Sequence, residues 1–239
     1  MSVFHFKQFS IAQGNSAMKV STDACLFGAV VATLPCAKIA KRILDIGTGT
    51  GLLSLMMAQA NEKATIHALE IDTGALEDAR HNFQSSPWGK NLILVPTDAK
   101  EFSNNIKYDL IISNPPFYEQ QLTGPNIAKN LAHHEAGLTL VALLEISFGL
   151  LNENGSLAVL LPYYRKHECI DLARQKGLFP ATIFEVKHSI YREAKRVILV
   201  FTNHQTNIEP QDKEIIIYEK EGDYTPEFLD YLKPYYLNL

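Results

Sequence analysis

Short apolar runs and longer amphipathic segments alternate through the middle of the chain. The runs at residues 43–46, 64–72, 91–95 and 107–112 are rich in Ile and Leu and predict buried strands. The segments between them, among them residues 73–83, space their apolar side chains for one face of a helix. Strands that alternate with helices predict an α/β fold with a mostly parallel sheet and helices on both faces.

The C-terminal half predicts a change in strand direction. A helix over residues 138–151 and a strand over residues 156–161 continue the alternation, with a turn expected at residues 152–155. No helix separates the apolar runs at residues 181–186 and 196–202. These two strands should therefore pair as an antiparallel hairpin at one side of the sheet.

Both ends of the chain read as additions to a single domain that covers residues 1–239. Aromatic and polar residues alternate from Phe4 to Ile11 and predict one short strand in an N-terminal extension over about residues 1–20. A C-terminal appendage over about residues 203–239 should hold a further strand at residues 214–218. Its tyrosines are interpreted as docking on the domain rather than stacking on bases.

The composition narrows the class of protein without identifying it. A chain of 239 residues with 46% hydrophobic residues can bury a substantial core, and a net charge of -4 disfavours non-specific coating of nucleic acid. Its three cysteines are far apart and predict neither a disulfide framework nor a metal site. Because no apolar run is long enough to cross a bilayer, we expect a cytoplasmic protein without a membrane partner.

A glycine-rich turn follows the first predicted strand of the domain. Asp45, Gly47, Gly49 and Gly51 stand at every second position, so the backbone can turn sharply into a helix with free amides. The dinucleotide fingerprint would need a glycine at Leu52, so a nicotinamide cofactor is disfavoured. The pattern resembles the S-adenosylmethionine loop of class I methyltransferases, which implies that these four residues bind that cofactor.

Acidic residues end the next two predicted strands. Glu70 stands about twenty residues after the glycines, where a carboxylate can accept hydrogen bonds from both ribose hydroxyls. Asp98 ends the following strand and could accept a hydrogen bond from the adenine amino group. Ile71 and Ala99 directly follow these acids and are counted with them as candidate cofactor contacts.

A third group of candidate cofactor residues precedes the glycine turn. Ser21 or Thr22 can cap a helix that runs to about Thr33, which places Asp23 in its first turn. Asp23 then either complements the helix dipole or lies, with Lys19 and Thr22, beside the methionine end of the cofactor. The sequence leaves both interpretations open.

The fourth strand of the domain runs into Asn114, Pro115, Pro116, Phe117 and Tyr118. Two adjacent prolines fix the backbone at this corner. The element resembles the Asn-Pro-Pro-aromatic motif of amino-methyltransferases, in which the first four of these residues are catalytic. Asn114 is also counted as a cofactor contact, and an aromatic ring here can stack on a flipped base.

Two later segments are candidates for substrate contact. The polar stretch at residues 117–138 leaves directly from the expected reaction centre and is interpreted as a substrate-gripping flap. His133 and His134 in this stretch lack acidic or cysteine partners at ligand spacing, so no metal is expected. The link between the two hairpin strands is basic and either contacts phosphate or is a solvated tip. The candidate phosphate contacts are Lys187, Arg192, Lys195 and Arg196.

Taken together, these motifs resemble the bacterial tRNA1(Val) (adenine(37)-N6)-methyltransferase family. The resemblance spans nearly the whole chain and includes the aromatic pattern Phe4-x-Phe6-Lys7-x-Phe9, the segment 18–23 and the run Ser86-Pro87-Trp88. It implies a Rossmann-like class I methyltransferase fold with a seven-stranded sheet and an antiparallel C-terminal hairpin. S-adenosylmethionine is then the methyl donor, and N6 of adenine 37 in a tRNA is the acceptor.

Other acceptors remain open from the sequence. The same motif serves amino-methyltransferases that act on guanine N2 in ribosomal RNA or on a glutamine side chain of a release factor. A fold does not prove catalysis, so an RNA-binding relative without activity is a further alternative. Asn114 and the acidic Glu70 argue against that last alternative.

Overall fold

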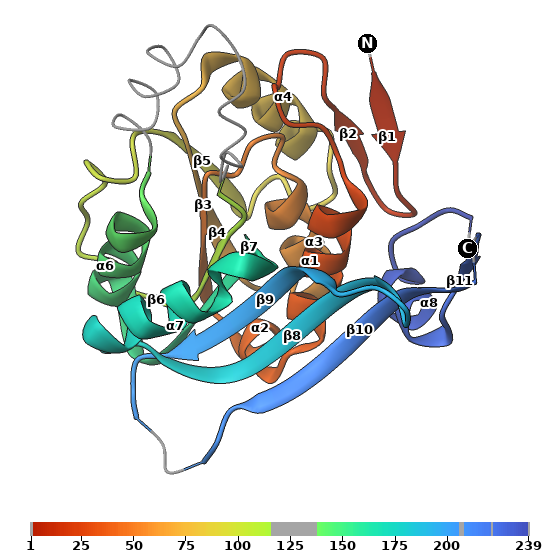
Figure 1. Ribbon diagram of the computed structural model, residues 1–239. Helices are drawn as coiled ribbons and strands as arrows, with labels where there is room; N and C mark the ends of the chain where they lie inside the picture. The colour runs from red at the N-terminus through yellow and green to blue at the C-terminus, as the bar shows by residue number, and fades with distance from the viewer. Residues whose placement is uncertain (1, 116–137, 206–207, 221, 239) are drawn as a thin grey trace, which may run out of the picture.

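The computed structural model describes residues 2–115, 138–205, 208–220 and 222–238, which build a nine-stranded sheet and a separate two-stranded one (Figure 1). The order of the large sheet is β11-β10-β8-β9-β7-β6-β3-β4-β5. Its strands are β3 (Arg42–Ile46), β4 (Thr65–Glu70), β5 (Leu92–Pro96), β6 (Tyr108–Ser113), β7 (Leu151–Pro162), β8 (Phe179–Ser189), β9 (Ala194–Thr202), β10 (Gln211–Lys220) and β11 (Asp223–Tyr224).

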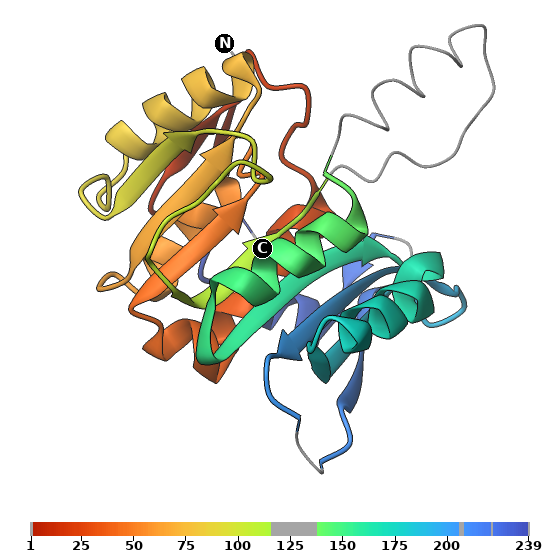
Figure 2. The ribbon, with the colours of Figure 1, turned by 90° about the vertical axis from the view of Figure 1, so that its left-hand side faces the viewer.

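Helices cover both faces of this sheet, as the alternating pattern predicts. They are α1 (Thr22–Thr33), α2 (Pro35–Ile39), α3 (Leu52–Ala60), α4 (Thr73–Gln84), α6 (Leu140–Leu150), α7 (Lys166–Gln175) and α8 (Pro226–Leu232), with a 3₁₀ turn η1 (Tyr163–Arg165). Figure 2 shows α6 and α7 together on one side of the sheet. None of the helices in the described ranges is long and apolar enough to cross a membrane.

The core consists of two hydrophobic clusters separated by the sheet. Ile43 and Ile66 belong to the cluster that includes the buried residues of α1 and α3. Leu44 and Ile111 point to the opposite face and pack with buried residues of α6 and α7. Because successive side chains of a strand face opposite sides, a continuous apolar run is what a strand between two helical layers requires.

The parallel centre and the C-terminal hairpin are confirmed. β3 to β7 run parallel, and β8 and β9 pair antiparallel through the expected hairpin. The seven predicted strands are all present, but the prediction that the sheet stops at seven is wrong. β10 adds in parallel beside β8, and β11 pairs antiparallel with β10. The addition buries Ile215 and Ile217, whose apolar surface would otherwise face water.

Two predicted boundaries need correction. The helix before β7 ends at Leu150, and residues 152–155 belong to β7 rather than to a turn. A register shift between β6 and β7 takes up the irregular segment, within which Asn154 has a φ of 64°. Asparagine tolerates this left-handed conformation better than most residues, so its turn-like composition fits a bulged strand.

The N-terminal extension is a hairpin and not the single strand that the alternation suggests. β1 (Val3–His5) and β2 (Ser10–Ala12) pair antiparallel, and the rings of Phe6 and Phe9 stack with centroids 4.5 Å apart. The C-terminal aromatics dock on the domain as expected, since Tyr235 is 3% exposed. Tyr236 forms an isolated bridge with Phe6, so the two ends of the chain pack against each other.

The close contact between α1 and α3 predicts a sharp difference between two helical glycines. A Cβ at Gly28 would lie 2.5 Å from Met56 Sδ, whereas a Cβ at Gly149 meets nothing within 4 Å. Gly28→Ala should lower the free energy of unfolding by about 1–3 kcal/mol through overpacking. Gly149→Ala, its control, should raise it by about 0.5–1 kcal/mol because alanine favours a helix. Urea unfolding measures both, and equal effects would contradict this packing.

Candidate active site

The polar candidates from the sequence line up along one edge of the sheet. β5, β4, β3 and β6 are consecutive parallel strands, so their carboxyl ends share that edge. The segments after these strands hold Asp98, Glu70, the glycine turn and Asn114, in that spatial order. Ligands of open α/β sheets bind outside the carboxyl ends of the strands, which makes this edge the candidate site.

The glycine turn has the backbone that its sequence predicts. Gly47, Gly49 and Gly51 have φ values of 74°, 57° and 84°, a region that favours glycine. Cβ atoms built on Gly47 and Gly49 would meet nothing within 4 Å, so the turn borders open space. A Cβ on Gly51 would lie 2.4 Å from the Phe83 ring, so this glycine also lets α3 and α4 pack closely.

Asp45 lies fully buried beneath the turn. Its Oδ2 accepts hydrogen bonds from the hydroxyls of Thr48 at 2.6 Å and Ser54 at 2.7 Å, while its Oδ1 has no partner within the described structure. Burial raises the pKa of Asp45 to about 6, although both hydroxyls lower it. A buried carboxylate oxygen without a partner is costly unless a ligand or water supplies a donor.

Glu70 joins the end of β4 to the glycine turn. One carboxylate oxygen accepts a hydrogen bond from the Gly49 amide at 2.8 Å, and the other accepts from the amides of Ile71 and Asp72 at 2.8 and 2.9 Å. These bonds fix the carboxylate beside the open turn. Ile71 is 65% exposed next to it and can offer apolar contact to a flat ring.

Asp98 and Ala99 follow β5 on the outer side of Glu70. The Lys100 amide donates to Asp98 Oδ1 at 2.9 Å, and its ammonium group lies 3.4 Å from Oδ2. Ala99 is buried against the cluster on the α6 side. Asp98 is thus an ordered acceptor at the expected edge, although both of its carboxylate oxygens already interact with Lys100 of the same loop.

The Asn114 corner lies directly beside the glycine turn. β6 pairs with β3, and Ser113 donates from its hydroxyl to the Ile46 carbonyl at 2.8 Å, which ties the last residues of the two strands together. Asn114 and Pro115 directly follow Ser113 in the chain; Asn114 is half-buried and Pro115 is buried. The remaining motif residues Pro116, Phe117 and Tyr118, and the stretch with His133 and His134, lie outside the described residues.

The candidates before α1 meet one of the hairpin candidates. Ser21 caps α1, and Asp23 in its first turn accepts a hydrogen bond from Arg196 Nε at 3.0 Å. Asp23 therefore faces a cation on β9 from far along the sequence. Lys19 donates to the Gln13 carbonyl, and Thr22 is exposed beside the cap.

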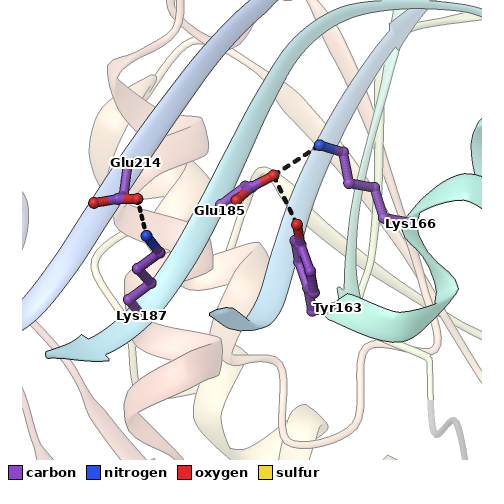
Figure 3. A network of polar contacts seen from close by, with 5 residues as sticks. All are labelled: Tyr163, Lys166, Glu185, Lys187 and Glu214. Atoms are coloured by element: carbon purple, nitrogen blue, oxygen red, sulfur yellow. Dashed lines mark hydrogen bonds and ion pairs between the residues drawn. The ribbon is translucent and has the colours of Figure 1, made fainter. Parts of the chain in front are cut away.

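The basic hairpin divides into separate environments. Lys187 lies on β8 and pairs with Glu214 of β10, as Figure 3 shows. Arg192 is exposed in the turn between β8 and β9, and Lys195 follows it at the start of β9. Ala194 pairs with Lys187 across the hairpin, so Lys195 and Arg196 follow on the strand next to Lys187. A role of the four residues in phosphate contact remains a prediction.

Sequence reasoning missed the hydroxyls that hold Asp45. Thr48 and Ser54 stand three and nine residues after the acid, one in the turn and one in the first helical turn. Both are buried, and buried hydroxyls close to a buried acid are signs of a built hydrogen-bond network. The turn pattern drew attention only to its glycines.

The residues at this edge fit S-adenosylmethionine. The open glycine turn and the fixed Glu70 carboxylate offer space and an acceptor to a ligand with a ribose, and the buried Asp45 holds the turn through Thr48 and Ser54. A parallel sheet in this strand order with such a turn defines a class I methyltransferase, whose methyl donor is S-adenosylmethionine. The class leaves the methyl acceptor undetermined.

Comparisons with known proteins agree with this class and narrow it. The family model "Methyltransferase small domain" matches residues 27–160. Two solved structures share the fold. The first is a predicted O-methyltransferase from Agrobacterium tumefaciens, which is 17% identical with a TM-score of 0.61; the match covers 91% of this chain and 100% of that one. The second is assigned as a class I S-adenosylmethionine-dependent methyltransferase from Listeria monocytogenes, which is 17% identical with a TM-score of 0.60; the match covers 86% of this chain and 67% of that one.

Relatives at higher identity carry a more specific name. A tRNA1(Val) (adenine(37)-N6)-methyltransferase from Flavobacterium johnsoniae is 38% identical over 99% of this chain and 100% of its own. One from Pseudoalteromonas translucida is 35% identical over 100% of both chains. The chain therefore belongs to the tRNA1(Val) (adenine(37)-N6)-methyltransferase family, as its motifs suggested.

Glu70 provides a test of cofactor binding at this edge. Glu70→Gln removes the charge that strengthens its hydrogen bonds, an effect of about 1.5–3 kcal/mol, so S-adenosylmethionine should bind about 10-fold more weakly or worse. Isothermal titration calorimetry measures the change. The control is Glu77→Gln, because Glu77 lies on α4 and bonds to the Asn15 side chain instead. Equal affinity of both variants would remove Glu70 from the cofactor site.

Proposed function

We propose that this chain transfers a methyl group from S-adenosylmethionine to N6 of adenine 37 in tRNA1(Val), the reaction named for its relatives. The observation that carries the proposal is the adjacency of two corners. The glycine turn and the Asn114 corner follow neighbouring parallel strands, and the bond from Ser113 to Ile46 joins them at 2.8 Å. The activity belongs to the cytoplasm, where tRNA is found.

Asn114 is assigned the task of holding the acceptor amine. The nitrogen of an exocyclic amine is a poor nucleophile because its lone pair is delocalised into the ring. If the Asn114 side-chain oxygen and the Pro115 carbonyl each accept one N–H bond, the amine becomes pyramidal and its lone pair is directed outward. When bound, S-adenosylmethionine supplies a methyl group activated on a sulfonium. The chain then contributes chiefly position, without a strong base.

The cofactor is assigned to the residues of the neighbouring strand ends. Glu70 accepts from the ribose, Asp98 from the adenine amino group, and the amides of the glycine turn remain close to the ligand. Asp45 supports the turn from below through Thr48 and Ser54. Lys19, Thr22 and Asp23 stay candidates for the methionine end. Pro116 stays a candidate of the catalytic corner, and Phe117 or Tyr118 a candidate for stacking on the flipped adenine.

The acceptor is tested by competition among substrates. The protein is incubated with radiolabelled S-adenosylmethionine and total tRNA, ribosomal RNA or release factor, and the labelled material is digested. We expect N6-methyladenosine from tRNA. Label in a methylguanine of ribosomal RNA or in a glutamine of the release factor would replace the proposal with one of these acceptors, and tRNA binding without label would indicate a non-catalytic relative.

A further inference from the structure

A cavity of about 560 Å³ is lined by three of the candidates named above, Asp23, Lys195 and Arg196, and by residues that have had no assignment so far. The ends of several sheet strands line it: Pro162 of β7, Val186 and His188 of β8, and Ile217 of β10. Tyr163 and Tyr164 of η1 form another wall. The volume falls in the range of small-ligand pockets.

The register places this cavity on the same sheet edge as the reaction centre. Ser113 at the end of β6 pairs with Val159 of β7, and Pro162, three residues later, pairs with Arg196 of β9. β6, β7 and β9 are consecutive strands. Two strand spacings of about 4.8 Å and three residues of about 3.3 Å along the strand place Arg196 of β9 roughly 14 Å from Ser113. A nucleotide next to the target adenine can reach this distance along the same RNA strand.

Tyr163 is held rigidly in the cavity wall. Its hydroxyl donates to Glu185 Oε1 at 3.1 Å, and the same oxygen accepts from Lys166 Nζ at 2.7 Å (Figure 3). Burial and the Glu185 carboxylate raise the pKa of the Tyr163 phenol, so it remains a donor. A ring fixed at its outer end is a ready surface for stacking, because it loses little freedom when a base binds.

The charges around the cavity favour a base over a phosphate. Lys195 and Arg196 are balanced by Asp23 and Glu193, which also line the cavity, and Arg196 is bonded to Asp23 at 3.0 Å. A phosphate site needs an excess of cations. A wall with both donors and acceptors instead matches the edge of a nucleobase, which presents both kinds of group.

We propose that this cavity binds one unstacked nucleobase that directly flanks the target adenine, with Tyr163 as its stacking surface. The inference rests on the proposed function, since it assumes an RNA substrate. It adds a specificity site to the reaction centre: the enzyme reads a neighbour of the methylated adenine through stacking and through the polar groups of Glu193 and Lys195.

Two substitutions at Tyr163 separate stacking from the hydroxyl bond. Tyr163→Leu removes the ring, and a stacked base is worth enough that RNA should bind about 10-fold more weakly. Tyr163→Phe keeps the ring and should bind within about twofold of the wild type. The control is Tyr191→Leu, because Tyr191 is 86% exposed at the hairpin tip and does not line the cavity. Fluorescence anisotropy measures the Kd for a stem-loop with the target adenine, without cofactor.

RNAs that lack one base locate the contact. Wild-type protein should bind about 10-fold more weakly to a stem-loop with an abasic residue at one position flanking the target, and Tyr163→Leu should lose nothing more on that RNA. Two results overturn the subsite. One is that Tyr163→Leu weakens binding by the same factor on the intact and on every abasic RNA. The other is that Tyr163→Leu binds the intact stem-loop with wild-type affinity. Methylation of the intact stem-loop by the wild type is measured alongside, so that a failed subsite is distinguished from a failed function.

Discussion

Asn114→Ala is expected to lower kcat for methyl transfer by about 100-fold or more, because a misplaced acceptor amine loses the alignment on which the reaction depends. The affinity for S-adenosylmethionine should stay close to that of the wild type, since the glycine turn and Glu70 remain intact. Single-turnover methylation of tRNA and calorimetric titration of the cofactor measure the two effects separately. A misfolded variant would lose both turnover and cofactor affinity, so only a loss of turnover with kept affinity supports the role of Asn114.

A neighbouring asparagine supplies the matched control. Asn105 is exposed in the loop before β6, outside the edge that holds the candidate site, so Asn105→Ala should turn over at the wild-type rate. Near-normal turnover of Asn114→Ala would refute the role assigned to this side chain. Equal losses of turnover in Asn114→Ala and Asn105→Ala would mean that the rate does not depend specifically on the Asn114 side-chain amide.

Asp45→Asn is expected to change how stability depends on pH. In the folded state, burial raises the pKa of Asp45 from 3.8 to about 6, so the folded protein holds this proton more tightly than the unfolded chain does. The contribution to stability is therefore present at low pH and is lost as the pH rises through about 6. Asp45→Asn has no carboxyl at this position and should not lose stability in this way. Its free energy of unfolding relative to the wild type should rise by about 2–3 kcal/mol between about pH 4 and pH 7.

The measurement is urea unfolding of cofactor-free protein across that pH range. Thr48→Val gives a control in the opposite direction, because the Thr48 hydroxyl lowers the pKa of Asp45. Its removal should raise the pKa further and make the loss of stability with rising pH larger than in the wild type. Parallel pH profiles of wild type and Asp45→Asn would show that the buried carboxyl does not titrate as described.

The sequence sufficed where a feature is local. The glycine turn after β3 and a helix cap at Ser21 or Thr22 are set by backbone conformation and by contacts a few residues apart; the structure has the turn and selects Ser21 as the cap. The parallel direction of the central strands also follows from the pattern, because βαβ units connect parallel strands. The two corners at residues 47–51 and 114–115 could therefore be expected at one edge.

Features that depend on distant partners could not be predicted. The apolar run within β10 indicates a strand, but nothing local shows that it pairs in parallel with β8. The N-terminal hairpin was missed because the turn between β1 and β2 lacks glycine and asparagine, the usual turn signals. The pair between Asp23 and Arg196 joins residues 173 positions apart, so no local pattern in the sequence indicates it.

The cavity beside η1 illustrates the same limit. Tyr163 follows a proline at the end of a strand and resembles an ordinary surface aromatic in the sequence. Only the fold brings Glu185 of β8 within 3.1 Å of its hydroxyl and closes the space with β10. The proposed base subsite therefore depends on contacts between segments that are far apart in the sequence.

Methyl transfer to adenine 37 is decided by incorporation of label into two purified tRNA1(Val) transcripts that differ only at position 37. With adenine at this position, the protein and labelled S-adenosylmethionine should yield N6-methyladenosine in that nucleotide. With guanine there, no label above background is expected. Label that persists in the guanine transcript, or that maps to another nucleotide of the adenine transcript, would mean that adenine 37 is not the acceptor.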